Sequence, residues 1–87
     1  MFQRIAIIGL GLIGGSLGLA LHKAKAAQQI VGHDLGKGVS DRARKMGAID
    51  AVYSTLADTL RGADLVIFAT PVGAMRTLLQ NSAPHLA

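Results

Sequence analysis

Short apolar runs alternate with amphipathic stretches along the chain. The apolar runs are rich in Ile, Val and Ala and do not alternate with polar residues, which is typical of strands buried on both faces of a parallel sheet. They predict four strands, at residues 5–8, 30–34, 51–53 and 64–70. Between the first two strands, apolar residues recur at helical spacing over residues 13–24, which predicts a helix.

A second helix is expected after the second strand. Ser40 and Asp41 are suitable residues to cap its start, Ala43 and Met46 would be buried, and Gly47 would end it.

Two more helices complete the pattern. Thr55 and Asp58 are spaced as a capping box, which predicts a short helix ending near Gly62. Pro71 can occupy the first turn of a last helix that Pro84 ends.

This βαβαβαβα order predicts an α/β fold. Short connections between successive strands favour right-handed crossovers and a parallel sheet with helices on both faces. We expect a partial, doubly wound sheet of about four strands in the order 3-2-1-4, with a ligand crevice where strands one and four diverge.

Residues 9–14 read Gly-Leu-Gly-Leu-Ile-Gly between the first strand and the first helix. A lone G-x-G-x-x-G is a weak signal, but here Asp34 also follows, 20 positions after the last glycine and at the end of the second strand. Together these features are typical of the pyrophosphate turn of a Rossmann-type dinucleotide-binding domain. A plain strand-to-helix turn with packing glycines is the alternative.

Each position of this turn has a physical task. Gly9 permits the tight turn, Gly11 lets the pyrophosphate approach the backbone, and Gly14 lets the helix pack closely. The amides of Leu12 and Ile13 would point at the phosphates from the positive end of the helix dipole.

Asp34 is the candidate for binding the adenosine ribose hydroxyls. Its charge would repel a 2′-phosphate, which favours NAD over NADP. The nearby Lys37 leaves NADP open, because a cation can hold that phosphate. Alternatively, Asp34 caps the loop that it begins.

Thr70, Pro71 and Val72 end the fourth strand, across the crevice from the glycine turn. Their backbone is expected to line the nicotinamide-ribose side of the cofactor. A strand end followed by a helix-initiating proline fits the same residues equally well.

The composition of the chain does not alter the predicted fold, and it bears on partners and metal sites. The chain has 51% hydrophobic residues, 3% aromatic residues, no cysteine and a net charge of +4. The scattered basic residues lack interleaved aromatic side chains, so we expect no nucleic-acid partner. No apolar run reaches the roughly 18 residues of a membrane span, and the three histidines have no metal or triad spacing. We expect a cytoplasmic protein with no membrane partner, no metal site and no catalytic residue in this chain.

The chain resembles the N-terminal part of the prephenate/arogenate dehydrogenases of tyrosine biosynthesis. The resemblance covers nearly the whole chain and is clearest at residues 7–17, 31–34, 46–50 and 69–72. Residues 36–38 read Gly-Lys-Gly, where the family more often has an Asn-Pro-type turn.

The resemblance implies NAD(P)-dependent oxidative decarboxylation of prephenate or arogenate. It also implies that the catalytic histidine and the substrate-binding arginine lie beyond Ala87, so residues 1–87 are expected to be a truncated dinucleotide-binding domain, inactive alone. The open edge of its sheet predicts a homo-oligomer through that edge or through an exchanged helix. Another dehydrogenase, such as an imine or hydroxyisobutyrate reductase, and a non-catalytic nucleotide-sensing module are the alternatives.

Overall fold

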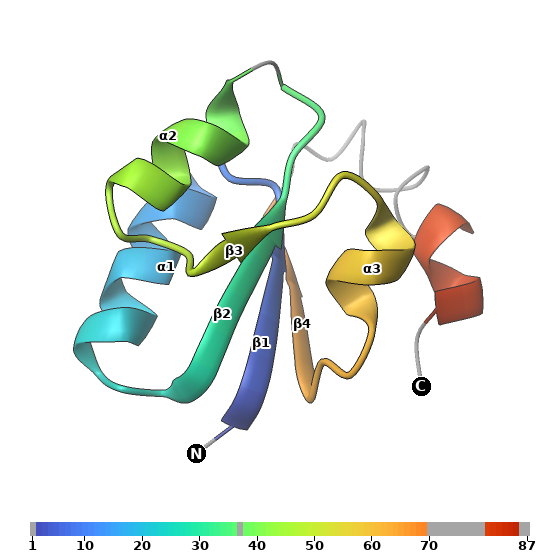
Figure 1. The fold of residues 1–87 in the computed structure, drawn as a ribbon, viewed down its shortest axis with the longest axis horizontal. Coiled ribbons are helices and arrows are strands. Elements are labelled where there is room, and N and C mark those ends of the chain that lie inside the picture. The colour runs from blue at the N-terminus through green and yellow to red at the C-terminus, as the bar shows by residue number, and fades with distance from the viewer. Residues whose placement is uncertain (1, 37, 70–79, 86–87) are drawn as a thin grey trace.

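Four parallel strands form the centre of the molecule (Figure 1). The computed structural model describes residues 2–36, 38–69 and 80–85. Within them the sheet has the order β3-β2-β1-β4, as the sequence predicts. The strands are β1 (Phe2–Ile8), β2 (Ala27–His33), β3 (Ala51–Val52) and β4 (Leu65–Phe68).

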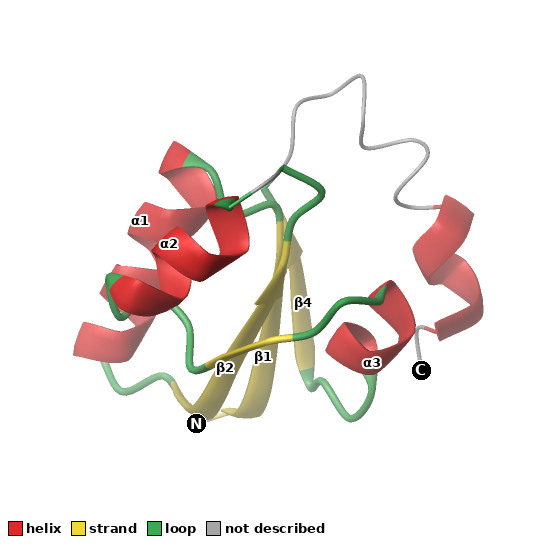
Figure 2. Ribbon diagram, turned by 45° about the horizontal axis from the view of Figure 1, so that its top comes forward, coloured by secondary structure: helices red, strands yellow, loops and turns green. Residues whose placement is uncertain are grey.

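Helices cover both faces of this sheet (Figures 1 and 2). Helices α1 (Leu12–Lys23) and α2 (Val39–Lys45) lie on one face. Helix α3 (Leu56–Leu60) and the 3-10 turn η1 (Ala83–His85) lie on the other. The described helices and strands confirm the doubly wound α/β fold.

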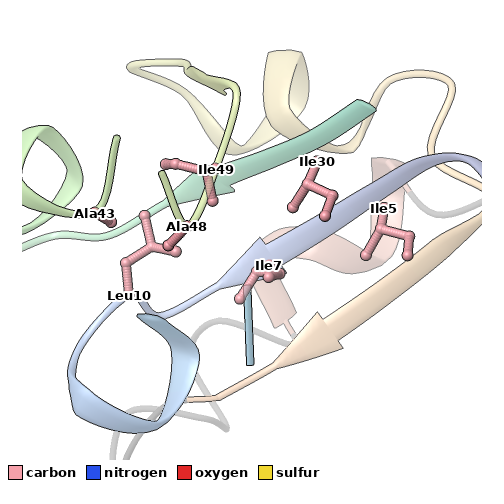
Figure 3. Close-up of a cluster of buried hydrophobic side chains, with 7 residues drawn as sticks. All are labelled: Ile5, Ile7, Leu10, Ile30, Ala43, Ala48 and Ile49. Carbon is pink, nitrogen blue, oxygen red and sulfur yellow. The ribbon is translucent and has the colours of Figure 1, made fainter. Parts of the chain in front are cut away.

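Strand β1 supplies the middle of two hydrophobic cores. Ile5 and Ile7 point toward α1 and α2, where Leu10, Ile30 and further side chains surround them (Figure 3). Ala6 and Ile8 point to the α3 face, and all four residues are buried. Burial of each isoleucine stabilises the fold by about 1.5–3 kcal/mol. The strand is thus a firm base for the turn that follows it.

Two strands begin earlier than the hydrophobic pattern predicts. Strand β1 starts at Phe2 and β2 at Ala27, and these two residues are partners in the parallel ladder. The first residues of both strands are largely exposed or half-buried. Backbone pairing continues there without an apolar side-chain signal.

The start of α2 differs from the sequence prediction. Gly38 is the residue that precedes the helix, in a left-handed conformation with φ of 79°. Ser40 therefore lies inside the first turn, and the prediction that it caps the helix is wrong. Asp41 shares that turn, where its charge complements the helix dipole.

The end of α2 matches the prediction in part. Gly47 has φ of 82°, and the amide of Ala48 donates to the carbonyl of Ala43 at 2.9 Å, as in a Schellman motif. Ala43 is buried as predicted, but Met46 is 57% exposed and its predicted burial is wrong. Met46 keeps a helical backbone conformation and lines a cavity beside Ala43, where no described element covers it fully.

The Thr55 half of the capping box predicted for α3 is confirmed. The side-chain oxygen of Thr55 accepts a hydrogen bond from the Asp58 amide at 3.2 Å. The predicted helix that starts at Pro71 lies outside the described residues up to position 79; residues 80–82 are helical and lead into η1. Within the described ranges, no helix is long and apolar enough to cross a membrane.

Candidate functional site

The glycine turn begins directly after β1. Gly9 has φ of 98°, a left-handed value that favours glycine. Its amide donates to the carbonyl of His33, at the end of β2, over 2.8 Å. The turn is therefore anchored to the neighbouring strand at its first residue.

Gly14 lies where the first turn of α1 is pressed against this turn. A β-carbon at Gly14 would overlap the carbonyl oxygen of Gly9 and lie 2.9 Å from its carbonyl carbon. Ala69, which follows β4, is also in contact range, at 3.5 Å. The close packing predicted for Gly14 is thus present in the fold.

Gly11 is different, because no close contact in the described fold requires a glycine there. Its φ of −69° suits any residue, and a β-carbon at this position would meet no described atom within 4 Å. It is the N-cap of α1 and has no side chain to cover the helix start. Open space at Gly11 gives a ligand direct access to the first amides of the helix.

Two apolar side chains beside Gly11 are unusually exposed. Leu12 and Ile13, the first residues of α1, are 89% and 75% exposed. Their amides belong to the first helical turn, which has no intrahelical acceptor and attracts anions.

Asp34 lies next to the glycine turn, as the sequence predicts. Its Oδ2 accepts a hydrogen bond from the Leu10 amide at 2.6 Å, and its Oδ1 accepts one from the Gly36 amide at 2.6 Å. The second bond caps the loop after β2, which is the alternative role that the sequence offers for Asp34. The first bond, to the glycine turn itself, was not predicted.

A cavity of about 280 Å³ opens beside the turn, between α1 and α2. Its walls are mainly apolar, with one hydroxyl and one guanidinium group. The lining residues are Leu10, Gly11, Leu12, Gly15, Ser16, Leu19, Val39, Arg42, Ala43 and Met46.

Two further residues support the site, and the sequence did not predict the role of the first, Gly18. A β-carbon at Gly18 would overlap the carbonyl oxygen of Ala48, so this second close approach fixes α1 against the segment that leads to β3. The glycine spacing Gly14–Gly18 on one helix face was the available signal. His33 is buried and its Nδ1 lies 3.1 Å from the carbonyl oxygen of Tyr53, which can only accept; this histidine therefore has a structural role.

The structure brings together six of the nine predicted cofactor-binding residues. They are Gly9, Gly11, Leu12, Ile13, Gly14 and Asp34. Thr70, Pro71 and Val72 lie outside the described residues, and so does Lys37. Cofactor contact by any of the nine stays a prediction.

Comparison with known proteins decides the family. The model of the family "Prephenate dehydrogenase, nucleotide-binding domain" matches residues 17–87. The chain belongs to this family. The match covers most of the chain and includes Asp34, while the glycine turn at residues 9–14 precedes it.

Individual relatives of the family agree. A cyclohexadienyl dehydrogenase of Zymomonas mobilis subsp. mobilis is 40% identical over 86 residues, which are 99% of this chain and 29% of that protein. A prephenate dehydrogenase of Bacillus subtilis is 36% identical over 95% of this chain and 22% of its own length. The chain therefore spans less than a third of these curated relatives.

A solved structure extends the likeness to three dimensions. The prephenate dehydrogenase of A. aeolicus, in complex with hydroxyphenyl propionate and NAD+, superimposes with a TM-score of 0.90 at 25% identity. The superposition covers all of this chain and 31% of that protein.

Proposed function

We propose that this chain is the NAD-binding part of a dehydrogenase that acts on prephenate or arogenate. One observation carries the proposal: the space around Gly11 is open, and no contact with a described atom requires a glycine there. A residue that leaves the helix start uncovered is what a bound pyrophosphate requires. The family membership of the chain and the NAD+ in the A. aeolicus structure support the same ligand.

The residues present fit this cofactor. The amides of Leu12 and Ile13 would donate to the phosphates, while Gly9 and Gly14 keep the turn tight around them. Asp34 would accept from the ribose hydroxyls, and its charge disfavours the 2′-phosphate of NADP. Residues 70–72 remain our proposal for the nicotinamide-ribose side.

Bound NAD supplies the hydride acceptor for the oxidation of a substrate. The proposal assigns to this chain the binding and orientation of that cofactor, as a dinucleotide-binding domain over residues 1–87. The oxidative decarboxylation of prephenate or arogenate is not assigned to this chain alone. The cyclohexadienyl and prephenate dehydrogenases that it matches are more than three times as long. Residues outside these 87 would bind the substrate and perform the chemistry.

Titration calorimetry with NAD, NADP and ADP-ribose tests the proposal. We expect NAD and ADP-ribose to bind, because both carry the pyrophosphate and the adenosine ribose, and NADP to bind more weakly. Absence of heat with all three nucleotides would contradict a binding role. NADH formation from NAD and prephenate by this chain alone would contradict the assignment of the chemistry to other residues.

We also propose that the edge of β4 pairs with a second copy of this chain. Strand β4 is the outermost strand of the sheet that the described residues form, and all four of its residues are only half-buried. Unpaired strand edges favour association. Light scattering over a wide concentration range should give a dimer mass, and a monomer mass throughout would contradict this pairing.

A further inference from the structure

Asp34 connects two loops of the candidate site through one carboxylate. One oxygen accepts from Leu10, in the middle of the glycine turn, and the other from Gly36, in the loop after β2. Both N···O distances are 2.6 Å, as short as the strongest charge-assisted bonds to a carboxylate or slightly shorter. The carboxylate therefore ties the glycine turn to the loop after β2.

Leu10 is well placed to transmit this restraint. Its side chain is buried in the core between β1, β2 and α2, and Figure 3 shows it close to Ala48 and Ile49. Its amide is held by Asp34, and the next residue is Gly11, where the turn opens. With the side chain and the amide both fixed, the backbone that enters Gly11 has little freedom.

We propose that Asp34 is a positioning residue that holds the glycine turn in the conformation that binds the pyrophosphate, besides its contact with the ribose. The inference rests on the proposed function, because it concerns the same nucleotide site. A carboxylate offers about four lone-pair sites. Two are used by Leu10 and Gly36, so the others stay available for ribose hydroxyls.

This role changes what a substitution at Asp34 should do. If Asp34 only selected the ribose, removal of its charge would weaken NAD binding and relieve the repulsion of NADP. If it also positions the turn, the same change weakens both nucleotides, because both bind through the pyrophosphate. The direction of the NADP effect separates the two roles.

Asp34→Asn is the informative variant. The side-chain amide keeps the size of the carboxylate but has one acceptor oxygen and one donor nitrogen. It can satisfy Leu10 or Gly36, and the other amide then faces a second donor. Asparagine is therefore not a conservative replacement at this position.

Asp64 offers a matched control. Its carboxylate also accepts two backbone amides, from Gln3 at 3.0 Å and from Arg4 at 3.2 Å. These bonds lie at the start of β1, whereas the glycine turn follows the end of β1. Asp64→Asn thus disturbs the same number of bonds far from the nucleotide site.

The test combines calorimetry with amide hydrogen exchange measured by NMR. We expect Asp34→Asn to weaken NAD and NADP alike, each by about tenfold or more, and to accelerate exchange at Leu10. Asp64→Asn should leave both affinities unchanged. Unchanged or tighter NADP binding in Asp34→Asn would overturn the positioning role.

Amide exchange keeps the inference separable from the proposed function. If the unsubstituted chain binds no nucleotide, the proposed function fails, while slow exchange at Leu10 and its loss in Asp34→Asn would still support the positioning of the turn. If Asp34→Asn does not fold, amide exchange in the unsubstituted chain tests the positioning role. Its Leu10 amide should then exchange more slowly than that of Leu12, and equal rates would overturn the inference.

Discussion

Replacement of Gly14 by alanine should destabilise the protein strongly. The added β-carbon would overlap the carbonyl oxygen of Gly9 and lie 2.9 Å from its carbonyl carbon. Ordinary carbon–carbon contacts begin at about 3.5 Å, so α1 and the turn must separate by more than roughly half an ångström. Both partners are backbone atoms and cannot turn aside.

The expected loss lies at the upper end of the range for overpacked sites, about 3 kcal/mol. For a domain of this size it corresponds to a fall in Tm of roughly 12–24 °C. Urea denaturation followed by far-UV circular dichroism measures it directly. Circular dichroism is preferable to fluorescence because the chain has no Trp and a single Tyr.

Gly15→Ala is the control in the same helical turn. A β-carbon at Gly15 lies 3.8 Å from the carbonyl oxygen of Leu10, an ordinary contact. Alanine also favours helix over glycine by about 1 kcal/mol. We expect Gly15→Ala to keep or raise the midpoint. Equal loss in both variants, or no loss in Gly14→Ala, would refute the packing argument.

Two further predictions concern helix ends. Thr55→Ala should lower the free energy of unfolding by about 1 kcal/mol, because the Asp58 amide loses its side-chain acceptor. Thr55→Ser keeps the hydroxyl and should retain most of the stability, and equal losses in the two variants would show that the hydroxyl is not the cause. Gly47→Ala should cost about 1–2 kcal/mol, since alanine disfavours the φ of 82°, and Gly47→Asn should cost less. Urea midpoints of the four variants check both, and an unchanged midpoint for Gly47→Ala would contradict the left-handed helix end.

The overall fold was predictable from the sequence because its signals are local. Apolar runs mark strands buried on both faces, and the helical period between them leaves one common topology. The central residues Ile5 to Ile8 carry this pattern and are buried as expected. The first three residues of β1 and of β2 were not predicted, because backbone pairing there needs no apolar side chain.

The candidate site was predictable only in part. The glycine spacing identified the turn, and the position of Asp34 placed a carboxylate beside it. The bond from Leu10 to Asp34 joins residues 24 positions apart. It depends on how two loops lie against each other, which the spacing of residues in the sequence does not reveal. The capping role of Gly38 was not predicted, because Ser40 is a common N-cap residue and the sequence does not show that Gly38 adopts the left-handed conformation before the helix.

We propose that the open space at Gly11 receives the pyrophosphate of NAD. Gly11→Ala tests it most directly, because a β-carbon there meets no described atom within 4 Å and the φ of −69° does not require glycine. With a pyrophosphate bound there, we expect calorimetry with NAD to show at least a tenfold loss of affinity for Gly11→Ala. The variant should stay folded and lose no more than about 1 kcal/mol of its free energy of unfolding, because alanine is a poorer N-cap than glycine. Unchanged NAD affinity in the folded variant would show that the pyrophosphate does not bind against Gly11.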